Sequence, residues 1–277
     1  MSFSIRRAFS QAFELVSARF GAMLAVSVIA MVLSWLMMGT YFGGMMGTVL
    51  SNPAAGEQMM MNSMGAGLFL VYAANFAISV TGYAAICALC SDRVSHTVGT
   101  ALGAGVRAMP SLVGAWLLLM LGMIAVSLVM MLVISGMAMA SSDPWMMLLI
   151  SIVIAAVFVY LLTKFSLILP IAAIDEVRNP FRLLGRSWTL TSGATLKIFA
   201  LYLLVFAAMF VVLVASFLAL IGIPRAGMVP PFGSLITMAL GMVVFGIVLQ
   251  LYLTALSAAI HRQLAGTSSE TMANAFA

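Results

Sequence analysis

Few side chains in this 277-residue chain could do chemistry, and the densest group of them lies between Lys164 and Lys197. Asp175 and Glu176 form the only adjacent pair of acids. Neighbouring residues do not share a helix face, so these carboxylates are poorly placed to work as a general acid and a general base. We interpret them as a solvated turn between a membrane span and an interfacial helix. An enzyme site built from Asp175, Glu176 and Lys164 is the alternative.

Lys164 lies near the predicted end of an apolar run. A lysine at such a position normally extends toward the lipid headgroups. The other interpretation is a buried ion pair with Asp175 or Glu176, for which Pro170 would have to bend the chain.

Two cysteines and two histidines could supply thiolate or imidazole ligands to a metal. Cys87 and Cys90 would share a helix face, so a metal site or a disulfide is geometrically possible. Without a second such pair, we interpret them as small packing residues. His96 and His261 lie far apart in the sequence without a nucleophile nearby, and we interpret them as interfacial side chains.

Methionine is unusually frequent, with 25 residues, many of them toward one predicted side of the membrane. Thioethers select Cu(I), which makes copper handling an alternative function. Methionine also replaces leucine freely in apolar segments, and no ordered ladder of Met or Cys crosses the predicted spans. We therefore expect no metal and no other cofactor. The clustered methionines are Met37, Met38, Met45, Met46, Met59, Met60, Met61, Met64, Met137, Met139, Met146 and Met147.

Asn75 and Gln250 are the most polar side chains well inside predicted spans. An amide in such a place usually bonds to a neighbouring helix, and the functional alternative is a polar contact in a lipid or solute pathway. Gly39, Gly43 and Gly47 recur every four residues. This spacing lets another helix approach closely, either within the bundle or from a second protomer or a membrane partner.

The composition excludes an ordinary soluble domain. The chain is 64% hydrophobic and 7% charged, with a mean hydropathy of +1.21, whereas soluble domains carry roughly 25% charged residues. The net charge of +5 does not indicate nucleic acid binding, because the basic residues are spread thinly along predicted helix ends. Arg6, Arg7 and Glu14 interrupt the N-terminal segment, which therefore does not read as a cleavable signal.

Six apolar runs are each long enough to cross ~30 Å of hydrocarbon. They predict an all-α polytopic membrane protein with six transmembrane helices arranged as three hairpins. We expect one membrane domain over 1–262 and a mobile cytoplasmic tail over 263–277. The runs are 21–49, 67–91, 111–139, 145–169, 196–222 and 233–260.

Lysine and arginine fix the predicted topology. Eleven of the twelve fall on one side or at its interface, and only Arg225 falls on the other. By the positive-inside rule, both termini are cytoplasmic.

A short amphipathic helix precedes each predicted hairpin, giving three pseudo-repeats over 3–91, 97–169 and 179–260. The first helix covers 3–20 and has an apolar face suited to the membrane interface. The second covers 97–110 and is expected to stop at Pro110.

The third amphipathic helix has the clearest boundaries. It starts at Asn179 and Pro180, a good N-cap followed by a residue suited to the first helical position, and it stops at Gly193. We expect an apolar face and an opposite polar face. The apolar face would carry Phe181, Leu184 and Trp188, and the polar face Arg182, Arg186 and Thr189.

The stretch 164–193 resembles the membrane domain found with bacterial glycerophosphoryl diester phosphodiesterases, and a related family of six-span bacterial inner-membrane proteins. The family pattern is a basic residue, an apolar run with proline, an acid, a turn and a helix ending Arg/Lys-Ser-Trp-x-Leu-Thr-x-Gly. The matching residues are Lys164, Pro170, Asp175 or Glu176, Asn179, Pro180, Arg186, Ser187, Trp188, Leu190, Thr191 and Gly193.

This resemblance implies a place in the bacterial cytoplasmic membrane. Some members of the family carry a soluble phosphodiesterase domain after the membrane part. The carboxylates and histidines of such a domain are missing here, so we expect no phosphodiesterase activity.

Two functions follow from these patterns. The first is a non-enzymatic, envelope- or lipid-associated membrane protein whose basic residues hold anionic headgroups, about 1 kcal/mol each. The second is a transporter or permease of a small amphiphile or lipid, which predicts a polar cavity lined by Asn75 and Gln250. Tight packing around both amides would contradict it. The candidate headgroup-binding residues are Arg6, Arg7, Arg107, Arg182, Arg186 and Lys197.

Overall fold

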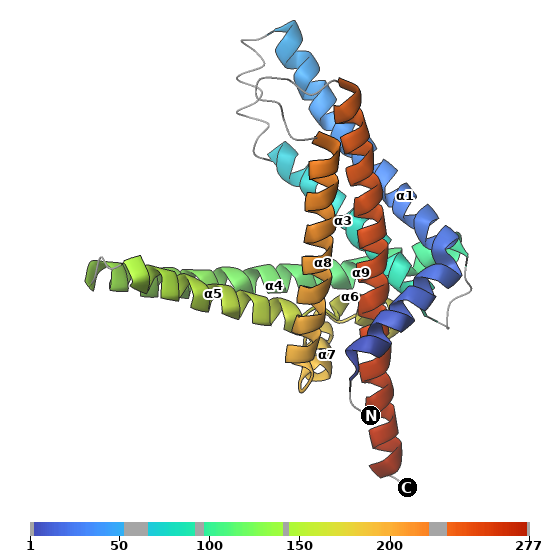
Figure 1. Cartoon of the computed structure of the whole chain (residues 1–277), viewed down its shortest axis with the longest axis vertical. Coiled ribbons are helices and arrows are strands. Elements are labelled where there is room, and N and C mark those ends of the chain that lie inside the picture. The colour runs from blue at the N-terminus through green and yellow to red at the C-terminus, as the bar shows by residue number, and fades with distance from the viewer. Residues whose placement is uncertain (1–2, 53–65, 92–96, 141–143, 222–231, 276–277) are drawn as a thin grey trace.

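A computed structural model describes residues 3–52, 66–91, 97–140, 144–221 and 232–275 (Figure 1). These residues are almost entirely helical, and no strand occurs among them. The helices are α1 (Ile5–Ser51), α3 (Ala66–Leu89), α4 (Val98–Ala140), α5 (Pro144–Lys164), α6 (Ile168–Ile174), α7 (Pro180–Thr191), α8 (Thr195–Ile221) and α9 (Phe232–Ala275).

Six helical segments are long and apolar enough to cross a membrane. Five are carried by α1, α3, α4, α8 and α9, and the sixth runs through α5 and α6. Large apolar side chains such as Leu132, Trp145 and Phe210 are exposed along these helices. Surfaces of this kind suit lipid rather than water. The fold is therefore compatible with an integral membrane protein.

The helices run in two main directions (Figure 1). α1, α3, α8 and α9 follow the long axis of the molecule, and both chain ends lie toward the same end of it. α4 and α5 pack on each other and project to one side. This crosswise hairpin departs from the common direction that three hairpins spanning one bilayer would share.

Close packing against α3 helps to explain the path of α4. A Cβ added at Gly105 would lie 2.4 Å from the carbonyl oxygen of Thr81, so only glycine allows the two backbones to approach this closely. α4 also continues as a helix through Pro110, so the predicted end of a helix at that residue is wrong. The missing N–H removes one helical hydrogen bond, but packing on α3 and α6 outweighs that loss.

The predicted interfacial helix 3–20 is the first part of α1. Its boundary is visible as a kink, because Arg19 has non-helical dihedrals (φ −130°, ψ 21°). The Arg19 guanidinium donates to the carbonyls of Leu89 and Ser91 at the end of α3. The kink therefore turns a cation toward a helix C-terminus, where it is favoured electrostatically.

The predicted span 145–169 is interrupted. α5 ends at Lys164, and α6 begins at Ile168 after a short non-helical connection. Pro170 lies in the first turn of α6, where its missing N–H would have had no helical partner.

The prediction for α7 is confirmed at both ends. The Asn179 side chain accepts hydrogen bonds from the backbone N–H groups of Phe181 (2.9 Å) and Arg182 (3.3 Å). Gly193 has φ +86°, a left-handed conformation that glycine adopts without strain. These two residues fix where the helix starts and stops.

α7 packs against the rest of the protein through residues that belong to neither predicted face. Leu183, Ser187 and Thr191 are the buried residues, whereas Phe181 is exposed. The two hydroxyls lie inward because each finds a carbonyl acceptor in the interior.

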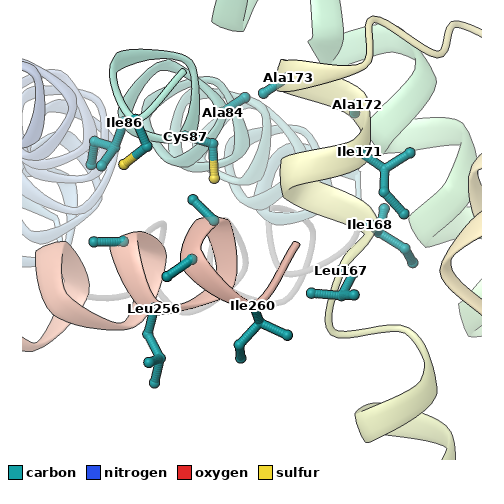
Figure 2. Close-up of a cluster of buried hydrophobic side chains, with 14 of the residues drawn as sticks. Ala84, Ile86, Cys87, Leu167, Ile168, Ile171, Ala172, Ala173, Leu256 and Ile260 are labelled. Carbon is teal, nitrogen blue, oxygen red and sulfur yellow. The ribbon is translucent and has the colours of Figure 1, made fainter. Parts of the chain in front are cut away.

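The apolar core lies where α3, α6 and α9 meet (Figure 2). Leu167, the N-cap residue of α6, and Ile171 of α6 are buried in this core, as are Leu256 and Ile260 of α9. Cys87 lies within it and is a free thiol, as is Cys90.

α9 continues as helix to Ala275. The residues 263–275, expected to form a tail, are therefore an extension of the last helix.

Candidate functional site

The polar cavity lies between α1, α3 and α9 and has a volume of about 440 Å³. Volumes of roughly 300–1,000 Å³ are typical of small-molecule sites. We call this cavity, with the one beside it described below, the α1–α3–α9 pocket. Its lining residues are Ser27, Ala30, Met31, Ser34, Trp35, Met38, Asn75, Ser79, Tyr83 and Gln250.

A second cavity of about 410 Å³ adjoins the first. The two share Met31, Trp35, Tyr83 and Gln250. The remaining lining of the second cavity comes from α9 and is apolar, with residues such as Val243 and Ile247. The pocket thus has a polar compartment next to an apolar one.

Two buried polar atoms of the first compartment have no partner among the described residues: Ser27 Oγ and Asn75 Oδ1. Hydroxyls in these helices usually donate to a carbonyl of their own helix, as Thr81 does to Ala77 (2.8 Å) and Thr254 to Gln250 (2.7 Å). Ser27 is 1% exposed and makes no such bond. Its hydroxyl therefore keeps an unused capacity to donate and accept a hydrogen bond.

The structure brings Asn75 and Gln250 together, as the transporter interpretation requires. They are not enclosed by tight packing, because both line the same cavity. Sequence reasoning missed Ser27, Ser79 and Tyr83. A signal was present on α3, where Asn75, Ser79 and Tyr83 follow one another at steps of four and so share a helix face.

A second polar region lies where α5, α6, α7 and α9 meet. We call it the Lys164–Asp175 junction. Lys164 is only 4% exposed, and its Nζ donates to Ser192 Oγ (3.2 Å). The same ammonium lies 4.9 Å from the ring centre of Trp188 and 5.6 Å from that of Tyr160, within the range of cation–π attraction. Among the described residues, the Lys164 ammonium thus contacts a hydroxyl and two aromatic rings, and no ion pair with Asp175 or Glu176 is found.

The backbone of Lys164 is also bonded. Its carbonyl accepts hydrogen bonds from Ser187 Oγ (2.8 Å) and Thr191 Oγ1 (3.3 Å). This carbonyl belongs to the last turn of α5 and lacks a helical partner. The Ser187 hydroxyl thus links α7 to the end of α5, which is a structural role.

Asp175 joins three helices. Its Oδ2 lies 2.9 Å from Arg186 of α7 and 3.0 Å from His261 Nε2 of α9. His261 is buried, so the prediction of an interfacial side chain is wrong for this histidine. Asp175 is likewise no solvated turn residue, whereas Glu176 is exposed and has φ 53°. Asp175 and Lys164 therefore contact different partners.

The candidate headgroup-binding cations are all exposed. Arg186 forms an ion pair with Asp175, although 47% of its side chain is exposed. The backbone carbonyl of Arg107 accepts a hydrogen bond from Arg178 (2.9 Å), which leaves the Arg107 guanidinium outward.

The glycine series of α1 does not pack within the described bundle. A Cβ added at Gly39, Gly43 or Gly47 would meet no described atom within 4 Å. Among the described residues, no other helix of this chain approaches these glycines closely. Contact with a second protomer stays a prediction.

Several potential metal ligands lie outside the described residues, among them His96 and Met59 to Met64. The side chains of Met137, Met139, Met146 and Met147 are not described either. Among the ranges that the structure describes, no group of three or more His, Cys, Asp or Glu could hold a metal.

Comparison of the chain with protein-family models, curated proteins and solved structures gave no match.

Proposed function

We propose that this chain is a non-enzymatic, lipid-associated protein of the bacterial cytoplasmic membrane that binds a small amphiphile, as a transporter or permease does. The α1–α3–α9 pocket supports this proposal most directly. It combines polar groups, two of them unpartnered, with an apolar compartment beside them. An amphiphile is the class of ligand whose two parts match these surfaces.

The position of the pocket also favours a ligand from the membrane. α1, α3 and α9 are each long and apolar enough to cross a bilayer, and Asn75 and Gln250 lie inside the apolar stretches of α3 and α9. A polar group inside such a stretch is costly and often marks a substrate pathway.

A second function is favoured by the basic surface. Arg6 and Arg7 lie close to the chain end, and Arg182 and Lys197 are exposed on or beside α7. With both termini in the cytoplasm, these cations would meet the anionic headgroups of the inner leaflet. Headgroup binding and amphiphile binding are compatible, because they use different residues.

Photo-crosslinking in nanodiscs tests the proposal. Purified protein would be labelled with diazirine-bearing single-chain amphiphiles, and the labelled peptides would be mapped by mass spectrometry. We expect labels to concentrate on the parts of α1, α3 and α9 that line the pocket. Equal labelling of all lipid-exposed helices would overturn the proposal.

A glycine substitution supplies a matched pair for this experiment. Gly246 lines the apolar compartment, and a Cβ added there would meet no described atom within 4 Å. Gly246→Leu should therefore fill the compartment without distorting α9 and reduce the pocket labels. Gly122 is equally open but lies on α4 outside the described pockets, so Gly122→Leu should leave them unchanged.

A further inference from the structure

We infer that the α1–α3–α9 pocket selects an uncharged amphiphile with a free hydroxyl in its head and a single apolar chain. This inference rests on the proposed function and adds the chemical class of the ligand. It assigns the hydroxyl to the space between Ser27 and Asn75 and the chain to the apolar face of α9.

The head must be uncharged because the pocket offers no countercharge. Neither compartment is lined by Lys, Arg, His, Asp or Glu. An ion brought into such surroundings loses its hydration without gaining a partner. The Lys164–Asp175 junction shows how this chain treats buried charge elsewhere: Asp175 faces Arg186 and His261.

A hydroxyl fits the two unpartnered atoms better than a group that only accepts. The Ser27 hydroxyl can donate or accept, and the free end of the Asn75 amide is an oxygen or, with the amide turned over, an NH₂ group. A ligand hydroxyl both donates and accepts, so it can serve both residues in either orientation of the amide. An ether or an ester oxygen has no hydrogen to give.

The chain of the ligand is assigned to the second compartment. Val243, Gly246 and Ile247 lie at steps of three and one along α9 and present apolar surface there. Because the two compartments share Met31, Trp35, Tyr83 and Gln250, one molecule can reach from the polar part into the apolar part.

Competition among three ligands with the same chain tests the head group. A diazirine-bearing tetradecanol would be the labelling probe, with unlabelled tetradecanol, tetradecanoate and methyl tetradecyl ether as competitors in nanodiscs at neutral pH. We expect tetradecanol to displace the probe from the pocket at concentrations about tenfold lower than the other two, the effect of one well-placed hydrogen bond. Equal or better displacement by tetradecanoate or by the ether would overturn the inference.

The same experiment separates the inference from the proposed function. If no amphiphilic probe labels the pocket, the proposed function fails. If the probe labels the pocket and the three competitors displace it alike, amphiphile binding stands and the selection of a hydroxyl fails.

Two substitutions check the residues assigned to the hydroxyl. Ser27→Ala and Asn75→Leu should each reduce labelling by the alcohol probe severalfold, and by a larger factor than they reduce labelling by an ether probe. Ser135→Ala is the matched control, since that exposed hydroxyl donates to Leu132 of its own helix (3.0 Å). Equal losses for the alcohol and ether probes would indicate a change of pocket shape and contradict the assigned hydrogen bonds.

Discussion

The α1–α3–α9 pocket and the Lys164–Asp175 junction are both polar regions inside an apolar helical protein, but they differ in how their polar groups are satisfied. In the junction, the Lys164 ammonium and carbonyl and the Asp175 carboxylate all have partners within the chain, and only His261 Nδ1 is buried there without a described partner. In the pocket, Ser27 Oγ and Asn75 Oδ1 are buried without a described partner.

This difference distinguishes polar groups that stabilise the fold from polar groups that would bind a ligand. A buried polar group without a hydrogen bond costs roughly 1–3 kcal/mol, whereas a bonded one contributes on the order of 1 kcal/mol. The junction therefore stabilises the fold, and the pocket lowers its stability. A protein retains such a cost where a ligand supplies the missing bonds, which is the pattern expected of a binding site.

Removing the charge of Asp175 should have the largest effect on stability. Asp175→Asn weakens the contacts with Arg186 and His261 and should lower the free energy of unfolding by about 2–3 kcal/mol, because charge-assisted bonds are the stronger kind. Reversible unfolding in mixed detergent micelles would measure it. Glu176→Gln removes the neighbouring exposed charge and should change stability by less than about 0.5 kcal/mol. Similar losses for the two variants would contradict the ion-pair role of Asp175.

Ser187→Ala should come next in size. Ser187 is fully buried and donates to the Lys164 carbonyl. Its loss should lower the free energy of unfolding by about 1–1.5 kcal/mol, because the carbonyl loses its better-placed donor. The same unfolding assay measures this change, and an unaltered stability would show that Thr191 alone holds the carbonyl.

Arg182 and Arg186 of α7 are expected to differ in a similar way, since the first should bind lipid and the second should stabilise the fold. Arg182→Gln should weaken binding to anionic lipid by about 1 kcal/mol and leave stability unchanged, because its side chain is exposed. Surface retention on nanodiscs of graded anionic content would measure the affinity. Arg186→Gln should chiefly lower stability, since it faces Asp175. If the two variants exchanged these effects, the assignment of Arg182 to headgroups would be wrong.

Ser27→Ala should have the smallest effect and the opposite sign from Ser187→Ala. Both serines are buried, but Ser27 has no described partner to lose. In the absence of ligand, the free energy of unfolding of the Ser27→Ala variant should be unchanged or raised by up to about 1 kcal/mol. Side-by-side unfolding of the two alanine variants is the measurement. A loss for Ser27→Ala as large as that for Ser187→Ala would remove the distinction between the two regions.

Features that depend on composition or on neighbouring residues could be predicted from the sequence. The bounds of α7 follow from Asn179, Pro180 and Gly193, whose backbone preferences act within a few residues. The membrane class follows from composition, and Asn75 and Gln250 stand out because amides are rare in apolar runs.

Contacts between distant segments were not readable. The pairing of Asp175 with His261 joins residues 86 apart, and no local pattern indicates it. Pro110 was taken as a stop because proline breaks isolated helices, whereas packing on α3 keeps α4 continuous. The amides were predicted one by one, but their common cavity depends on how α1, α3 and α9 pack.

The guanidinium groups at the end of α3 also bear on biosynthesis. Arg19 donates to the carbonyls of Leu89 and Ser91, and Arg262 donates to that of Cys90. Arg19 precedes α3 and is available as soon as that helix has been made, whereas Arg262 belongs to α9, which is synthesised after the other described helices. The end of α3 thus gains its final donor only when α9 has been synthesised. Closure of the bundle, and with it the formation of the pocket, is therefore a late event in the maturation of the nascent chain.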